Sequence, residues 1–348
     1  MLKKIISVTF SVLLVAYLFF YPLDYYISKP GGAYNTEDFV KVLGGDEDDK
    51  GSFSLTTVSM AKATPFSYIL ASLRDFYDIR PIDEVRLEEE DDEEYKVRQL
   101  KMMDDSKFNA LYMAFTRADK PFYVTYKGIY VLNVYEDSAA DGILQPGDII
   151  VEVDNQTIKD KEMLSNYLLK LQKNDKVSMV IEREGQLLTK SISLKEIPNS
   201  DGKIGLGISY NESKTIRTEP NVKMDTNEIG GPSAGLMFTL EILNQLVDED
   251  LTKGYDIAGT GEMLTDGKVG RIGGIEKKVV AAHEEGKDYF FAPNDEITDE
   301  MKKEIPGIQS NYELAKETAE KIGTKMEIVP VQTIDDAIKF LNELSPKN

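Results

Sequence analysis

Residues 230–235 of this 348-residue chain have the sequence Gly-Gly-Pro-Ser-Ala-Gly, and the residues that follow, from Ala234 to Val247, have the apolar spacing of a helix. A serine at the start of a helix lies beside free backbone N–H groups, and these groups can stabilise a negatively charged oxygen. Lys278 follows downstream, and no histidine is matched to the serine. The stretch therefore points to a hydrolase that uses a serine and a lysine.

The composition excludes several other kinds of site. The chain has no cysteine and one histidine, His283, so thiolate catalysis, disulfides and Cys-rich zinc sites are excluded, and we expect no metal and no cofactor. The formal net charge of −20 argues against a nucleic-acid partner, because phosphate contacts need clustered Lys and Arg.

The same serine also satisfies a second pattern, the Gly-x-Ser-x-Gly nucleophile elbow of α/β-hydrolases. That alternative needs His283 as the base and Asp266 or Glu276 as the acid. It also needs an apolar strand before the elbow, whereas residues 225–230 are mostly polar. The elbow is therefore the weaker hypothesis.

The N-terminus predicts a membrane-spanning helix. Lys3 and Lys4 precede an uncharged run from Ile5 to Tyr21, which makes about 25 Å of helix, at the short end for a span. A cleaved signal peptide is the rival, but the bulky residues after the run offer no small-x-small site. The two lysines predict a cytoplasmic N-terminus, so the rest of the chain would lie outside the cell.

Residues 122–197 resemble a PDZ domain. The specific part is Leu-Gln-Pro-Gly-Asp-Ile-Ile at residues 144–150, with Ser-Ala-Ala at 138–140 before it. The helix expected over residues 161–172 would form one wall of a peptide groove. The resemblance implies a module that binds an extended peptide at a sheet edge, and the alternative is a purely structural module.

Within that module, the resemblance assigns substrate binding to Gly128, Ile129, Tyr130 and Val131, where such domains carry the loop that receives a peptide carboxylate. Tyr130 departs from the pattern, because this position is usually small or aliphatic. Capture of a free C-terminus therefore stays open.

The stretch from Gly230 to Pro293 resembles the proteolytic domain of Lon-type serine peptidases. The motifs that carry this resemblance occur in order: Gly-Pro-Ser-Ala-Gly at 231–235, Thr-Gly-Glu at 260–262, Ile-Gly-Gly-Ile-Glu-Lys-Lys at 272–278, and Ala281-Ala282.

The resemblance implies that Ser233 is the nucleophile and that Thr260 hydrogen-bonds the base. The base is the lysine four residues after the second glycine of the third motif, which is Lys278 and not Lys277. Apolar neighbours such as Val279 and Val280 can supply the environment that lowers a lysine pKa from about 10.4 towards neutrality. The departure is Gly230, where many members have an acidic residue.

Together these features resemble the membrane-anchored, ATP-independent Lon-like serine proteases of Gram-positive bacteria that carry a PDZ domain. The sequence contains no Gly-x-x-x-x-Gly-Lys-[Ser/Thr] motif, the phosphate-binding loop that an ATP-dependent protease would need. The resemblance implies an α+β fold with a transmembrane helix, a PDZ domain and a Lon-type α/β domain. The expected divisions are a cytoplasmic tip and signal anchor (1–27), an extracellular segment belonging to the protease domain (28–121), the PDZ domain (122–197) and the protease domain (198–348).

The implied function is cleavage of peptide or protein substrates at the outer cell surface, without nucleotide, with the PDZ domain recruiting the substrate. The strand from Phe53 to Val58 resembles the opening strand of a Lon-like domain, which would make the PDZ region an insertion. The alternative function is a catalytically silent surface adaptor that binds extended peptides.

Overall fold

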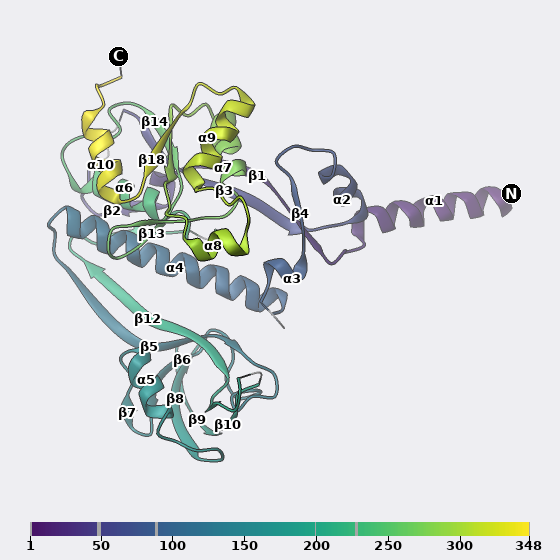
Figure 1. Cartoon of the computed structure of the whole chain (residues 1–348), viewed down its shortest axis with the longest axis vertical. Helices are drawn as coiled ribbons and strands as arrows, with labels where there is room; N and C mark the ends of the chain where they lie inside the picture. The colour runs from purple at the N-terminus through teal and green to yellow at the C-terminus, as the bar shows by residue number, and fades with distance from the viewer. Residues whose placement is uncertain (1, 47–49, 88–89, 199, 227–228, 348) are drawn as a thin grey trace.

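The computed structural model describes residues 2–46, 50–87, 90–198, 200–226 and 229–347. They form an N-terminal helix, an α/β body and a β-rich module that lies below the body in Figure 1. The expected mixture of helices and strands is confirmed.

A six-stranded sheet forms the centre of the body, in the order β18-β17-β14-β3-β1-β4. Strands β3, β14, β17 and β18 are parallel to their neighbours in this set, whereas β1 is antiparallel to β3 and β4. Their bounds are β1 Tyr25–Asn35, β3 Ser52–Lys62, β4 Asp78–Pro81, β14 Asp256–Gly259, β17 Tyr289–Pro293 and β18 Glu327–Val331. The sheet therefore combines strands from both ends of the chain.

Helices cover both faces of this sheet because successive strand residues point to opposite sides. Ile257 and Phe291 belong to the core formed with α4 (Asp92–Arg117), α6 (Gly235–Leu246) and α10 (Ile334–Glu343). Ala258 and Phe290 belong to the core formed with α7 (Ile275–Glu284) and α9 (Asn311–Ile322). The result is a three-layer body in which α4 packs outside α6 (Figure 1).

The β-rich module has its own sheet, in the order β12-β5-β6-β8-β9, and its own apolar core. Its main elements are β5 (Phe122–Val134), β6 (Ile149–Val153), α5 (Lys161–Leu168), β8 (Lys176–Arg183), β9 (Gln186–Ser193) and β12 (Ile208–Thr218). The chain enters along β5 and leaves along β12, which pair antiparallel from Phe122 opposite Thr218 to Val134 opposite Ile208. This two-stranded ribbon joins the module to the body (Figure 1).

The remaining elements are short. They are η1 (Thr36–Asp38), β2 (Val40–Val42), α3 (Ile82–Val85), β7 (Gln156–Thr157), β10 (Lys195–Glu196), β11 (Ile204–Gly205), β13 (Val222–Met224), β15 (Glu262–Met263), β16 (Val269–Gly270) and α8 (Asp299–Glu304). Strands β2 and β13 pair antiparallel, so a segment before the module meets a segment after it.

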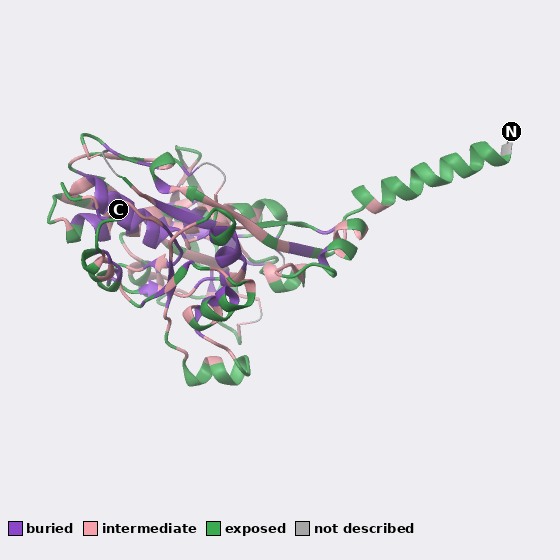
Figure 2. Cartoon of the chain, turned by 90° about the horizontal axis from the view of Figure 1, so that it is seen from above, coloured by how far each residue is buried: buried purple, intermediate pink, exposed green. Residues whose placement is uncertain are grey.

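Helix α1 (Leu2–Phe20) extends away from the body and is exposed along its length (Figure 2). Within the described residues it is the one helix that is long and apolar enough to cross a membrane, by length and composition. Its end contacts the short helix α2 (Pro65–Ala71), where the rings of Phe19 and Phe66 stack with centroids 4.5 Å apart.

Candidate active site

Ser233 lies in the turn immediately before α6, and α4 holds this turn in place. The N–H of Gly231 donates to the carbonyl of Gln99 at 2.9 Å, and the Ser106 hydroxyl donates to the carbonyl of Pro232 at 3.0 Å. Gly231 has φ +85°, a conformation that favours glycine. Ser233 itself is half-buried, so a substrate can reach it.

The closeness of α4 also gives a physical reason for the departure at Gly230. A Cβ atom at this position would lie 2.9 Å from Cβ of Gln99. An acidic side chain at residue 230 would therefore require the turn or α4 to move.

Lys278, on α7, brings its amine to the serine. Its Nζ lies 2.6 Å from Ser233 Oγ and 2.9 Å from Thr260 Oγ1. Thr260, directly after β14, donates its own hydroxyl to the carbonyl of Ser233 at 3.0 Å. The structure thus brings together Ser233, Lys278 and Thr260, which the sequence places on three separate segments.

Burial controls the charge of this lysine. The Lys278 side chain is almost fully buried, and burial lowers its pKa from 10.5 to about 7. Among the described residues, the hydrogen-bond partners of its amine are the hydroxyl groups of Ser233 and Thr260, which satisfy a buried amine without adding charge. A neutral amine at pH 7 has a lone pair that can accept a proton.

Lys277, the neighbouring lysine, points elsewhere. It is also almost fully buried, but its amine forms an ion pair with Asp78 on β4. The two lysines are consecutive on α7, and their side chains leave the helix in different directions. Lys278 therefore reaches the serine, and Lys277 reaches a carboxylate.

His283 does not complete a serine–histidine arrangement. It is exposed near the end of α7, and its Nδ1 lies 2.9 Å from Thr324 Oγ1. The base of the elbow hypothesis is thus hydrogen-bonded on the surface of the α7–α9 layer. Among the residues described, no group of three or more His, Cys, Asp or Glu side chains could hold a metal ion.

The predicted peptide edge at residues 128–131 is wrong, because β5 is paired on both sides there. Ile129 lies opposite Glu212 of β12 on one side and opposite Ile150 of β6 on the other. The side chains of Ile129 and Val131 are fully buried in the core of the module. Gly128, Ile129, Tyr130 and Val131 therefore present no free strand edge to a peptide.

In the part of this sheet that the structure describes, the edge strands are β12, which pairs with β5, and β9, which pairs with β8. The start of α5 lies beside β12, since the N–H of Lys161 donates to Glu212 Oε1 at 3.5 Å. Residues 205–208, Gly-Leu-Gly-Ile, lead into β12. Gly207 has φ +73°, and a Cβ there would lie 2.3 Å from Cβ of Ser138, so this turn requires glycine.

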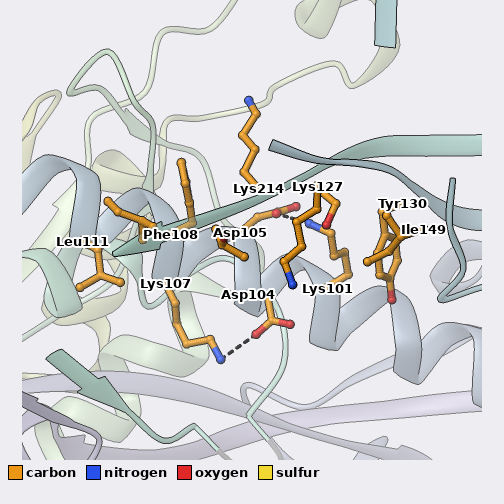
Figure 3. A pocket seen from close by; sticks show the side chains of 13 residues that line it. Lys101, Asp104, Asp105, Lys107, Phe108, Leu111, Lys127, Tyr130, Ile149 and Lys214 are labelled. Carbon is orange, nitrogen blue, oxygen red and sulfur yellow. Dashed lines mark hydrogen bonds and ion pairs between the residues drawn. The ribbon is translucent and has the colours of Figure 1, made fainter. Parts of the chain in front are cut away.

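Tyr130 has a different role from the one predicted. Its ring lies under Lys101 of α4, with Nζ 5.3 Å from the centroid, at the junction of the module and the body. Lys101 forms an ion pair with Asp105, whose pKa is raised by burial, and Asn211 of β12 lies 3.4 Å from Asp105. A cavity of about 360 Å³ opens here between α4, β5 and β12 (Figure 3).

Helix α4 therefore contacts both functional regions. Gln99 and Ser106 hold the turn before Ser233, while Lys101 and Asp105 face the β-rich module. These contacts could not be predicted from the sequence, because the spacing in α4 indicates only an amphipathic helix and not what its two sides contact.

Comparison with known proteins assigns both units. Residues 85–194 match the family model of the PDZ domain, and residues 227–342 match the Lon protease (S16) C-terminal proteolytic domain. The first match extends over α4, which packs on α6 of the body.

Curated relatives of similar sequence are Lon proteases. The Lon protease of Mycoplasma mobile is 31% identical over 136 residues, which is 34% of this chain and 16% of the relative. The Lon protease of Vibrio parahaemolyticus is 27% identical over 164 residues, which is 47% of this chain and 18% of the relative. The chain thus spans less than a fifth of the length of these relatives.

Among solved structures, the PDZ domain of the SdrC-like protein from Listeria monocytogenes is 30% identical, with a TM-score of 0.24, covering 25% of this chain and 92% of that one. The two family-model matches show that the chain contains a PDZ domain and a proteolytic domain of the Lon type.

Proposed function

We propose that this Lon-type serine peptidase with a PDZ domain is a membrane-bound endopeptidase that cleaves peptide or protein substrates at the outer cell surface, without ATP. Ser233 would be the nucleophile and Lys278 the general base. The observation that carries the proposal is the 2.6 Å separation of Lys278 Nζ and Ser233 Oγ, with burial lowering the lysine pKa to about 7.

The hydrogen bonds around Lys278 fit the role of a base. The hydroxyl of Thr260 donates its hydrogen bond to the carbonyl of Ser233, so the Thr260 oxygen can act only as an acceptor towards the amine of Lys278. An N–H of neutral Lys278 can donate to that oxygen while the nitrogen lone pair points to Ser233. Thr260 thereby orients the amine for proton transfer.

The reaction would proceed by acyl transfer. Ser233 Oγ attacks the scissile carbonyl as its proton passes to Lys278, and the ammonium then returns the proton to the leaving amine. Water hydrolyses the acyl-enzyme with Lys278 again as the base. Ser233 and Ala234 lie ahead of the first turn of α6, so their N–H groups are placed to stabilise the oxyanion.

The PDZ domain would recruit the substrate through β12 and not through β5. An extended peptide could pair with the free edge of β12, with α5 as the opposite wall. Beside the start of β12, the hydroxyls of Ser138 and Ser209 are buried and have no hydrogen-bond partner among the described residues, which supports a polar ligand at this place.

The domain order supports an insertion. Strands β3 and β14 lie before and after the PDZ region in sequence and pair parallel in the body. Helix α1 would anchor the chain, with Lys3 and Lys4 in the cytoplasm and both folded units outside.

The test uses the full chain in lipid nanodiscs with a casein-like substrate and a small fluorogenic peptide. We expect cleavage without ATP, unchanged by EDTA, and lost in Ser233→Ala. Peptide binding without cleavage would identify an adaptor instead. Activity that needs ATP, or that survives Ser233→Ala, would overturn the proposal.

A matched pair of glycines tests recruitment separately. Gly207→Val adds a Cβ that meets Ser138. Gly185→Val has the same left-handed strain (φ +76°), but its added Cβ meets no described residue within 4 Å. Gly207→Val should weaken cleavage of the protein substrate but spare the small peptide, and Gly185→Val should spare both. If the two variants cleave the protein substrate equally, β12 does not recruit it.

A further inference from the structure

Helix α2 has an apolar face that is exposed to solvent. Phe66, Ile69, Leu70 and Leu73 are 44%, 57%, 38% and 78% exposed. Their spacing places them on one side of a helix, and Leu73 extends this side just beyond the last helical residue. A contiguous apolar face of this kind marks an interaction surface.

The opposite side of α2 is fixed to the body. Ala71 is buried in a small cluster with Ile27 and Ala63, and the rings of Tyr68 and Tyr25 meet edge to face at 5.3 Å. Thr64 caps the helix through a reciprocal pair of hydrogen bonds with Ser67. The exposed side chains are therefore held on a rigid support.

This face continues the surface of α1. Phe66 stacks on Phe19, and Figure 1 shows α2 beside the end of α1 that faces the body. The connection is also short and fixed, because the N–H of Leu23 donates to the carbonyl of Ala63 at 2.8 Å. If α1 spans the bilayer, α2 must lie at the bilayer surface.

We propose that the face formed by Phe66, Ile69, Leu70 and Leu73 is buried in the interfacial layer of the membrane beside the outer end of α1. This inference rests on the proposed membrane anchoring. The body would then contact the lipid through two adjacent apolar elements, α1 and α2, and not through α1 alone. The apolar faces of interfacial helices lie about 5–10 Å into the boundary between headgroups and acyl chains.

Apolar burial and not charge would drive this contact. The chain has a formal net charge of −20, so anionic lipids do not attract the protein as a whole. Arg74, which follows Leu73 and is exposed, is placed to meet a lipid phosphate at the edge of the apolar face. The contact should therefore form on zwitterionic lipid as well.

The chain has no tryptophan, so one introduced tryptophan is a unique fluorescent reporter. The experiment places single tryptophans in the full chain, reconstituted in zwitterionic nanodiscs with or without bromine-labelled acyl chains. Ile69→Trp and Leu73→Trp report on α2, Phe10→Trp reports on α1, and Leu187→Trp, on the exposed side of β9, is the remote control.

We expect bromolipid to reduce the fluorescence of Ile69→Trp and Leu73→Trp by about twofold or more, with label near the headgroup more effective than deep label. Phe10→Trp should be quenched most by deep label, and Leu187→Trp should be unchanged. If Phe10→Trp is quenched but the α2 reporters are not, this inference is overturned and the anchoring stands. The same holds if a second copy of the protein covers the α2 reporters and shields them from the lipid. An unquenched Phe10→Trp would overturn the anchoring itself.

Discussion

On one side of α7, Lys278 lies against Ser233 and Thr260, whereas on the other side Lys277 lies against the carboxylate of Asp78. Both lysines are almost fully buried. The contacts of Lys278 are neutral hydroxyls, and burial lowers its pKa to about 7. Burial therefore makes a lysine a base where no carboxylate compensates its charge.

The largest expected effect separates these two lysines by activity. Lys278→Met and Ser233→Ala should each reduce peptide cleavage by about 1000-fold or more, and the double variant should be no worse, because the two groups act as a unit. Lys277→Met should keep most of the activity. Steady-state cleavage of a fluorogenic peptide measures all four, and an active Lys278→Met with an inactive Lys277→Met would reverse the assignment.

The second effect concerns the stability of the same variant: Lys278→Met should lose activity but gain free energy of unfolding. The unfolded chain binds a proton at Lys278 between about pH 7 and 10.4 that the folded chain does not, so stability rises with pH across this window. Lys278→Met removes this cost and should stabilise the fold by roughly 4 kcal/mol at pH 7, less its lost hydrogen bonds, and the gain should shrink as the pH rises from 7 towards 10.4.

Urea unfolding of each variant at pH 7 and pH 10 measures this difference. Lys277→Met is the matched control, because it removes a cation that has a partner at Asp78. A Lys277→Met variant that is stabilised as much as Lys278→Met would show that the two sides of α7 do not differ.

The third effect concerns Thr260. Thr260→Val keeps the shape but removes the oxygen that accepts from the lysine, so cleavage should fall by about 10- to 100-fold. Thr260→Ser retains the hydroxyl and should restore most of the rate. The ratio of these two rates is the measurement, and equal rates would mean that the hydroxyl does not orient Lys278.

The smallest effect comes from α4. Ser106→Ala removes the hydrogen bond to the Pro232 carbonyl and should lower kcat by about threefold to tenfold with little change in KM, because the turn before Ser233 loses one support. Thr116→Ala, an exposed position on the same helix, is the control. A loss confined to KM would place Ser106 in substrate binding instead.

The sequence predicted the arrangement at α7 better than the groove of the PDZ domain. Gly274, at the start of α7, fixes the register of Lys278, so motif spacing alone distinguishes this lysine from Lys277. Which strand has a free edge depends instead on pairing between distant segments. Strand β12 begins at Ile208, beyond the predicted boundary at residue 197, and its pairing with β5 closes the edge at Ile129.

The role of α4 was also beyond the sequence. A capping box at Asp91 begins this helix, but the contacts of Gln99 and Ser106 are made to residues more than a hundred positions away. Local sequence patterns do not predict contacts between residues so far apart in the chain. Gly205 and Gly207, in the turn that leads into β12, are a sequence signal for the groove.

The most direct test of the central claim is the pH dependence of kcat/KM for a small, uncharged peptide. A base must be unprotonated to act, so the rate should rise with pH through an apparent pKa near 7 and then level off. A rate that keeps rising through pH 9 to 10, as for a lysine with its ordinary pKa, would contradict the account.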